Sequence, residues 1–238
     1  MSTRVIVTLP TYNEADNVRP LIAEILALGE NFEVLVIDDD SPDGTWKIVK
    51  ELAAEIPRVH LLHRTHERGR GTAGRDGFKW AVENGAEAVV EMDADYSHRP
   101  RHIPAMIEAL ERGADVVIGS RLVPGGGEVG RGAGRRIITV LANFYIRVVL
   151  WLPIRDCTTG FRVFRGSVLG KIPWDRVEST GPEIVQEILL FARAQGVKMV
   201  EVPITFEERA AGTSTFNAKI AVRSLLAVLR FRFRGFRA

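Results

Sequence analysis

Short apolar runs alternate with longer amphipathic stretches through the first half of the chain. The apolar runs predict strands at residues 5–9, 32–38, 59–63, 88–93 and 115–120. The stretches between them predict helices at residues 17–28, at 45–55, at about 72–83 and from about Pro100 onward. Alternating strands and helices are typical of parallel βαβ units with right-handed crossovers. We therefore predict the α/β class, with an open, mostly parallel sheet flanked by helices.

The regular alternation stops after Arg121, at the glycine-rich sequence PGGGEVGRGAG of residues 124–134. A loop of this length and composition is typical of a lid or of a segment that binds substrate. Beyond it, the pattern predicts an apolar helix from about Arg135, a turn at 155–162, a helix at 183–196, a strand at 199–206 and a basic helix at the C-terminus. We divide the chain into one α/β domain at 1–215 and a basic amphipathic helix at 216–238.

The composition of the 238 residues, 46% hydrophobic and 26% charged, is that of a chain that forms a packed core. The net charge of +2 is too small to indicate a nucleic-acid partner. The single cysteine, Cys157, excludes an intrachain disulfide, and no sequence feature marks a base that would activate its thiol. No secretory signal is recognisable, and no stretch reaches about 18 uninterrupted apolar residues. We therefore expect a cytoplasmic protein without a membrane-spanning helix.

Carboxylates follow two of the predicted strands, at the sheet edge where ligands of open α/β sheets bind. The sequence EMDADYSHRP places Asp93 and Asp95 after one strand, and Asp38, Asp39 and Asp40 end another. Two like charges one residue apart repel each other unless a cation lies beside them. Mg²⁺ typically takes one or two protein carboxylates and completes its shell with water and phosphate oxygens. The pattern therefore predicts a divalent metal that also holds a phosphate ligand.

A structural role for the same residues remains open at this stage. Asp95 or Ser97 could cap the helix that starts near Pro100, since Asp and Ser are favoured at that position. In the same way, Ser41 or Asp43 could cap the helix that begins at residue 45.

Two further motifs point to other chemistry but are not favoured. The sequence GRGTAG of residues 69–74 fits G-x-G-x-x-G, yet a polar segment at 64–68 separates it from the preceding strand, so a nicotinamide nucleotide is not expected. His98 follows the acidic pair, but hard cations prefer oxygen ligands and no second histidine stands at a metal-pair spacing. We expect a loop or capping role for His98.

Seven motifs together resemble those of the dolichol-phosphate mannosyltransferases, the polyprenyl-phosphate mannose synthases among the inverting GT-A glycosyltransferases. In chain order they are LPTYNE, VIDDDSPDGT, GRGTAGRDGF, MDADYSHRP, GSR, RDCTTGFR and VPITFEERAAGTS, which span nearly the whole chain. The resemblance implies a nucleotide-sugar-binding GT-A fold, with residues 1–215 as the catalytic domain. It also implies transfer of mannose from GDP-mannose to a polyprenyl phosphate, with Mg²⁺ or Mn²⁺, by a peripheral protein on the cytosolic face of a membrane.

The resemblance also implies roles for individual residues. Nucleotide-sugar contacts are implied for Pro10, Tyr12, Glu14, Asp39, Asp43, Gly71 and Asp93. Metal ligands are implied at Asp93, Asp95 and Ser97. Catalytic roles are implied for Asp95, Arg121 and Arg209, and contacts with the acceptor phosphate for Arg121, Arg135 and Thr139. The chain departs from its relatives at Thr215, where they carry Lys, and at Glu67-Arg68, where a Lys is expected before the glycine motif.

Arginines suit a phosphate acceptor, because a planar guanidinium can bind two phosphate oxygens at once. Arg121 ends a predicted strand, although a surface ion pair would also explain it. Arg135 and Arg136 begin a helix whose backbone N–H groups could also meet phosphate, and a solvated helix end is the alternative. Glu187, on an apolar helix, could orient an arginine or act on the acceptor.

The C-terminal sequence KIAVRSLLAVLRFRFRGFR combines apolar residues with cationic charge and contains no acid. Interleaved Phe231, Phe233 and Phe236 are typical of an interfacial anchor, and an ordinary core-packing helix is the alternative. No nucleic-acid-binding module accompanies this segment. A separate membrane subunit is compatible with the sequence. Two rival functions also remain, a UDP-glucose-dependent polyprenyl-phosphate glucosyltransferase and a catalytically silent nucleotide-binding membrane scaffold.

Overall fold

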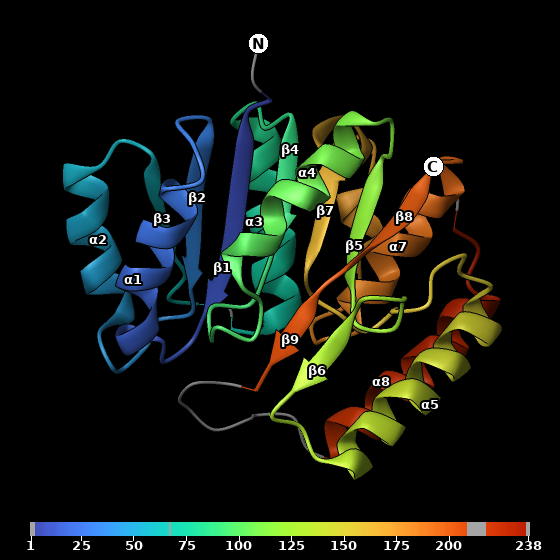
Figure 1. Ribbon diagram of the computed structural model, residues 1–238. Helices are drawn as coiled ribbons and strands as arrows, with labels where there is room; N and C mark the ends of the chain where they lie inside the picture. The colour runs from blue at the N-terminus through green and yellow to red at the C-terminus, as the bar shows by residue number, and fades with distance from the viewer. Residues whose placement is uncertain (1–2, 67, 209–217, 237–238) are drawn as a thin grey trace.

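A seven-stranded sheet forms the centre of the molecule (Figure 1). The structure is a computed structural model and describes residues 3–66, 68–208 and 218–236. In spatial order the strands are β3 (Val59–His63), β2 (Phe32–Asp38), β1 (Val5–Thr11), β4 (Ala88–Glu91), β7 (Arg162–Arg165), β5 (Val116–Ser120) and β8 (Met199–Pro203). Neighbouring strands are parallel, except that β7 runs antiparallel to β4 and β5. The predicted α/β class and mostly parallel sheet are confirmed.

Helices cover both faces of this sheet. They are α1 (Ala15–Leu26), α2 (Thr45–Glu55), α3 (Arg70–Glu83), α4 (Ile103–Glu111), α5 (Ala133–Leu150), α6 (Gly166–Leu169), α7 (Ile184–Ala194) and α8 (Ala218–Phe233), with 3₁₀ turns at Pro100–His102 and Trp174–Arg176. Val5 and Val7 of β1 pack with α1, α2 and α4, whereas Ile6 packs on the opposite face with α3 and α7. Because both faces are buried, the strands read as continuous apolar runs.

The second half of the chain differs from the prediction in its strands. β7 follows the predicted turn at 155–162 and is inserted in the middle of the sheet, with Arg162 opposite Glu91. The predicted strand at 199–206 is divided at Ile204: β8 stays in the main sheet, and β9 (Thr205–Glu207) pairs with β6 (Gly127–Val129) in a small second sheet. β6 therefore lies inside the predicted glycine-rich loop.

The parallel strands bring distant segments of the sequence to one edge. β1, β2, β4 and β5 run in the same direction, so that their carboxyl ends lie along one side of the sheet. The segments that follow them begin at Tyr12, Asp39, Met92 and Arg121. Figure 1 shows α5 and α8 running side by side along one margin of the molecule, and these two helices are in contact.

A candidate active site at the carboxyl edge of the sheet

The main cavity at this edge has a volume of about 610 Å³. Its lining consists of residues 10–14, Asp39, residues 68–70, Ala73 and residues 93–95. The structure therefore brings together most of the residues predicted to hold a nucleotide sugar and a metal. These are Pro10, Tyr12, Glu14, Asp39, Asp93 and Asp95.

The acidic pair has two different environments. Asp93 is partly exposed and lies 3.5 Å from the guanidinium of Arg70, which also bonds Glu91 at 2.8 Å. Asp95 is buried, and its Oδ1 accepts hydrogen bonds from the backbone N–H of Ser97 at 3.0 Å and from its hydroxyl at 2.5 Å. The 3₁₀ turn that starts at Pro100 has no side-chain cap, so neither Asp95 nor Ser97 serves the capping role.

The oxygen donors of this pair fit a divalent cation that is shared with a ligand. Asp93 and Asp95 both line the cavity, and the Ser97 hydroxyl is held against Asp95. Within residues 3–66, 68–208 and 218–236, no group of three or more His, Cys, Asp or Glu side chains could hold a metal by itself. Two carboxylates with phosphate oxygens and water form the usual set for Mg²⁺, whereas an all-protein cage would need more donors.

His98 supports the loop of the acidic pair from within the protein. Its Nδ1 accepts a hydrogen bond from the backbone N–H of Asp93 at 3.0 Å, and its ring stacks on Phe161 with 5.0 Å between the centroids. Burial lowers the pKa of His98 below its ordinary value, although Asp93 and Asp95 oppose this shift. The histidine is therefore neutral at pH 7 and carries its proton on Nε2. This geometry agrees with the predicted loop role.

Asp39 and Asp43 hold neighbouring segments in place. Asp39 bonds Arg64 Nε at 2.8 Å and the backbone N–H of Gly69 at 2.8 Å, and its pKa is raised because burial outweighs these bonds. Asp43 accepts hydrogen bonds from the backbone N–H groups of Thr45 and Ala15 at 2.9 and 3.0 Å. Burial raises the pKa of Asp43, but hydrogen bonds from Thr45 and Ala15 outweigh this effect and lower it. Asp43 thus connects the first residues of α1 and α2, although the N-cap residue of α2 is Gly44, which makes no side-chain cap.

Gly71 contacts protein backbone instead of the cavity. Its N–H donates to the carbonyl oxygen of Thr180 at 3.1 Å, and an added Cβ would lie 2.5 Å from the carbonyl carbon of Thr180. Only glycine permits this close approach of α3 to the segment before α7. The neighbouring Gly69 and Arg70 line the cavity.

Arg121 forms a buried ion pair. The sequence suggested an ion pair only as the alternative to phosphate binding, and placed it at the surface. The Nε and Nη2 of Arg121 bond the two oxygens of Asp156 at 2.7 and 2.8 Å, and Nη2 also bonds Thr158 at 2.7 Å. Its Nη1 lies 3.4 Å from Glu128. Burial raises the pKa of Asp156, but hydrogen bonding to Arg121 outweighs this effect and keeps it below its ordinary value. Asp156 was missed as a site residue, although the motif RDCTTGFR contains it.

The remaining predicted acceptor residues lie at the start of α5. Arg135 is exposed and pairs with Glu208 at 2.9 Å. Thr139 donates its hydroxyl to the carbonyl oxygen of Arg135 and accepts a bond from Arg131 at 3.2 Å. Arg131 also bonds Glu128 at 2.8 Å and was missed, because in the sequence it is one cation within a glycine-rich loop. Arg209 lies outside the described residues, as do Glu67 and Thr215.

Glu187 and Cys157 are both buried inside the protein. Glu187 is buried, accepts bonds from the backbone N–H groups of Glu178 and Ser179, and pairs with Arg234 at 2.6 Å. Glu187 therefore orients Arg234, which is one of the two roles that the sequence suggested for it. Cys157 is buried, and burial raises its pKa to about 12, so its thiol stays protonated.

The structure thus places an acidic pair beside a cavity at the carboxyl edge of an open α/β sheet, where ligands of such sheets bind. Residues 6–172 match the family model described as Glycosyl transferase family 2. The chain belongs to this family.

Similar proteins agree with the resemblance that the motifs indicated. The chain is 40% identical over 99% of its length to a protein named undecaprenyl-phosphate mannosyltransferase from Micrococcus luteus, of which it covers 98%. It is 39% identical over 98% of its length to polyprenol monophosphomannose synthase from Mycolicibacterium smegmatis, covering 88% of that protein. It is also 37% identical over 95% of its length to dolichol-phosphate mannosyltransferase from Pyrococcus furiosus, of which it spans 63%.

Solved structures show the same fold at lower identity. Glucosyl-3-phosphoglycerate synthase from Mycobacterium tuberculosis, in complex with Mn²⁺, UDP and glucosyl-3-phosphoglycerate, superposes with a TM-score of 0.69 and 18% identity. The match covers 97% of this chain and 80% of that one. At this identity the likeness shows the shared GT-A-like fold.

Proposed function

We propose that the protein transfers mannose from GDP-mannose to a polyprenyl phosphate, with inversion at the anomeric carbon and with a divalent metal. The similarity over nearly the full length to a protein named undecaprenyl-phosphate mannosyltransferase carries this proposal. The acidic cavity at the sheet edge supports the nucleotide-sugar half of the reaction.

The donor binds in the main cavity. Pro10, Tyr12 and Glu14 line it and would contact the nucleoside, while Asp93 and Asp95 would hold Mg²⁺ or Mn²⁺ beside the diphosphate. When bound, the ion supplies Lewis-acid stabilisation of the departing diphosphate. Asp95 keeps its orientation through Ser97, and His98 fixes the backbone at Asp93.

The acceptor attacks the anomeric carbon directly. A phosphate monoester has a second pKa of about 6, so its oxygen is largely anionic at neutral pH and needs no general base. One of these oxygens forms a bond to the anomeric carbon while the bond from that carbon to the GDP oxygen breaks, and this single displacement inverts the configuration. Alignment of the two reactants is therefore the main task of the protein.

The arginines near β6 bind the acceptor phosphate. Asp156 fixes the guanidinium of Arg121, which leaves Nη1 directed at Glu128. Arg131 bonds the same Glu128 oxygen, so an acceptor phosphate that displaces this carboxylate meets two guanidinium groups. Arg135 and Thr139, the other two residues predicted to contact this phosphate, lie next to them at the start of α5.

The lipid tail of such an acceptor requires a membrane surface. No helix in the described part of the chain is long and apolar enough to span a bilayer. The α5–α8 apolar face instead exposes large hydrophobic side chains: Ile137, Ile138, Val140, Leu141, Phe144, Val148, Trp151, Leu225, Leu226, Leu229 and Phe233. Exposed Arg135, Arg223 and Arg230 accompany it and suit anionic headgroups. We propose that this face rests on the cytosolic side of the bilayer.

A transfer assay tests the proposal. The protein is incubated with Mn²⁺, a polyprenyl phosphate in detergent, and either radiolabelled GDP-mannose or radiolabelled UDP-glucose. The expected result is label in the organic extract from GDP-mannose alone. Label from UDP-glucose would favour the glucosyltransferase instead, and label from neither donor with folded protein would favour a silent scaffold or the need for a separate membrane subunit.

A further inference from the structure

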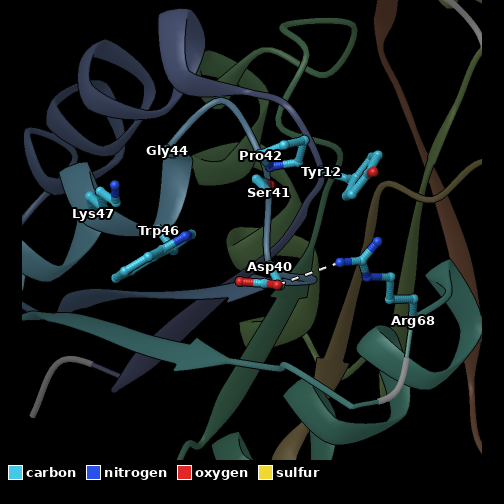
Figure 2. A pocket seen from close by; sticks show the side chains of 8 residues that line it. All are labelled: Tyr12, Asp40, Ser41, Pro42, Gly44, Trp46, Lys47 and Arg68. Atoms are coloured by element: carbon cyan, nitrogen blue, oxygen red, sulfur yellow. Dashed lines mark hydrogen bonds and ion pairs between the residues drawn. The ribbon is translucent and has the colours of Figure 1, made fainter.

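A hollow with a volume of about 300 Å³ lies at the C-terminal ends of α5, α7 and α8, and we call it the helix-end hollow. Its lining consists of Leu150, Trp151, Leu190, Arg193 and residues 231–236. The hollow drawn in Figure 2 differs from it, because that one shares Tyr12 and Arg68 with the main cavity and so belongs to the candidate active site. The helix-end hollow and the main cavity are lined by different residues.

Three arginines line the helix-end hollow: Arg193, Arg232 and Arg234. Arg234 pairs with the buried carboxylate of Glu187 at 2.6 Å, so its charge is balanced. In the part of the chain that the structure describes, neither Arg193 nor Arg232 forms an ion pair. The guanidinium carbon of Arg232 lies 4.6 Å from the centroid of the Trp151 ring. Two positive charges at the hollow therefore favour an anionic ligand.

The end of α5 would repel an anion if its last carbonyl oxygens faced the hollow, because the C-terminus of a helix carries partial negative charge. Arg193 prevents this. Its Nη1 donates hydrogen bonds to the carbonyl oxygens of Leu150 and of Trp151, the latter at 2.9 Å. The guanidinium thus covers the end of the helix, and its remaining N–H groups can bond a ligand in the hollow.

Large apolar side chains rim the hollow. Trp151 is 72% exposed and Phe233 is 87% exposed. Exposed apolar side chains recur along α5 at intervals of four and three residues, at 137, 141, 144, 148 and 151, which places them on one face of the helix. Trp151 is therefore at the end of the α5–α8 apolar face. A tryptophan at such a place is typical of the headgroup level of a membrane, so the surroundings suit a lipid better than a soluble anion.

The helix-end hollow and the predicted acceptor residues lie at opposite ends of this face. α5 and α8 lie side by side, and both end at the hollow (Figure 1). Arg135 and Thr139 are in the first turns of α5, and the 18 residues of this helix span about 27 Å. Cationic groups thus flank the apolar face at both ends, as expected for helices that lie in the plane of the lipid headgroups.

We propose that the helix-end hollow binds the phosphate of an anionic phospholipid between Arg193 and Arg232, with the acyl chains beside Trp151 and Phe233. The inference rests on the proposed position of the α5–α8 apolar face on the bilayer and adds a headgroup site to it, separate from the site for the acceptor phosphate. A lipid held there fixes the far end of α5 at the membrane surface, so that Arg135 at the other end meets a phosphate at the same level.

Quenching of tryptophan fluorescence by brominated lipids tests this site in the full chain. Vesicles contain phosphatidylcholine and phosphatidylglycerol in equal amounts, and bromine is carried by the acyl chains of either the one lipid or the other. Both preparations have the same surface charge. We expect quenching at least roughly twofold stronger when phosphatidylglycerol carries the bromine, because the two guanidinium groups select the anionic headgroup next to Trp151.

Three variants assign this difference to the hollow. Arg232→Gln replaces an exposed side chain, so the fold should be retained while the two preparations quench almost equally. Trp151→Phe, which keeps the other three tryptophans, should also remove the difference. The matched control is Arg147→Gln, which removes an exposed positive charge of α5 outside the hollow and should keep the wild-type difference.

The other outcomes overturn the inference at different levels. Equal quenching of the wild type by both preparations, or an unchanged difference in Arg232→Gln, would overturn the headgroup site while the membrane-bound face stands. A difference that disappears in phosphate buffer of equal ionic strength would assign the hollow to free phosphate instead of a lipid. A wild-type protein that neither preparation quenches would overturn the face and the site together. Because no donor or acceptor is present, a failure of mannose transfer would leave these results standing.

Discussion

At the scale of single residues, the buried pair between Arg121 and Asp156 connects stability to the acceptor side. Both side chains are almost completely buried, and the guanidinium meets the carboxylate with two bonds of 2.7 and 2.8 Å. A buried charge that loses its partner is costly, because neither water nor another ion replaces the interaction. Asp156 therefore both stabilises the fold and fixes the position of the Arg121 guanidinium.

Asp156→Asn should lower the free energy of unfolding by about 3 kcal/mol at pH 7, because Arg121 is left buried without its counter-charge. Chemical denaturation with urea measures this difference. Asp175→Asn, an exposed position, is the control and should change stability by less than about 0.5 kcal/mol. A loss as small as that of the control would contradict the structural role of the pair.

The same pair predicts a pH dependence. The pKa of Asp156 in the folded protein lies below its ordinary value of 3.8. A depressed pKa stabilises the fold above the pKa of the unfolded chain, and this stabilisation is lost as the pH falls through the folded pKa. The difference in stability between wild type and Asp156→Asn should stay constant from about pH 8 to about pH 5 and shrink only below about pH 4. A difference that already declines between pH 7 and pH 6 would contradict this assignment.

At the scale of elements, α5 and α8 both carry large apolar side chains that remain exposed to solvent. Val228 and Phe231 of α8 are buried in the core, whereas Leu226 and Phe233 are exposed. One side of α8 therefore packs in the core, as the core-packing alternative predicts, and the other side exposes apolar side chains. The hydroxyl of Tyr145 on α5 bonds the carbonyl oxygen of Leu225 on α8 at 3.2 Å, which joins the two helices.

Replacing two side chains of the α5–α8 apolar face should weaken membrane binding. We expect Phe144→Glu combined with Leu226→Glu to reduce binding to vesicles of anionic phospholipid at least roughly tenfold, because each change puts a charge where an apolar side chain enters the interface. Cosedimentation with vesicles measures the bound fraction. Ala105→Glu, exposed on α4, is the control. Equal binding of the double variant and the control would contradict the assignment of this face.

Gly71→Ala tests the close contact between α3 and the segment before α7. The added Cβ would lie 2.5 Å from the carbonyl carbon of Thr180 and 2.8 Å from backbone atoms of Gly181, so α3 must shift. We expect a loss of about 2 kcal/mol in the free energy of unfolding and weaker binding of Mn²⁺-GDP, because Gly69 and Arg70 line the cavity. Gly134→Ala, where an added Cβ meets nothing within 4 Å, should preserve both quantities. Unchanged unfolding in Gly71→Ala would contradict the packing role.

At the scale of the whole molecule, the sequence predicts the parallel half well and the rest only in part. Strands buried on both faces give continuous apolar runs, which made β1, β2, β4 and β5 recognisable. β7 has only four residues, begins and ends with Arg, and depends on pairing with β4 and β5, so its local sequence carries little signal. β6 and β9, of three residues each, likewise depend on each other.

The candidate site was predictable where chemistry follows a strand and less so where it depends on tertiary contacts. Asp93 and Asp95 follow β4 directly and line the cavity, as expected. Asp156 meets Arg121, 35 residues away in the sequence, only through folding, and spacing along the chain does not reveal such a contact. Arg131 is close to its partner Glu128 in the sequence, but the position of both beside Arg121 also depends on the fold. Gly71 was predicted to contact the nucleotide. In the structure the neighbouring backbone explains why glycine stands there, because an added Cβ would lie 2.5 Å from the carbonyl carbon of Thr180.

The most direct test of the central claim is the rate of mannose transfer from GDP-mannose to a polyprenyl phosphate as a function of free Mn²⁺. Chelation should abolish transfer, added Mn²⁺ should restore it, and Asp95→Ala should lower the rate at least roughly 100-fold while the protein stays folded. Transfer that persists in the chelated protein, or an Asp95→Ala variant as active as wild type, would contradict the claim.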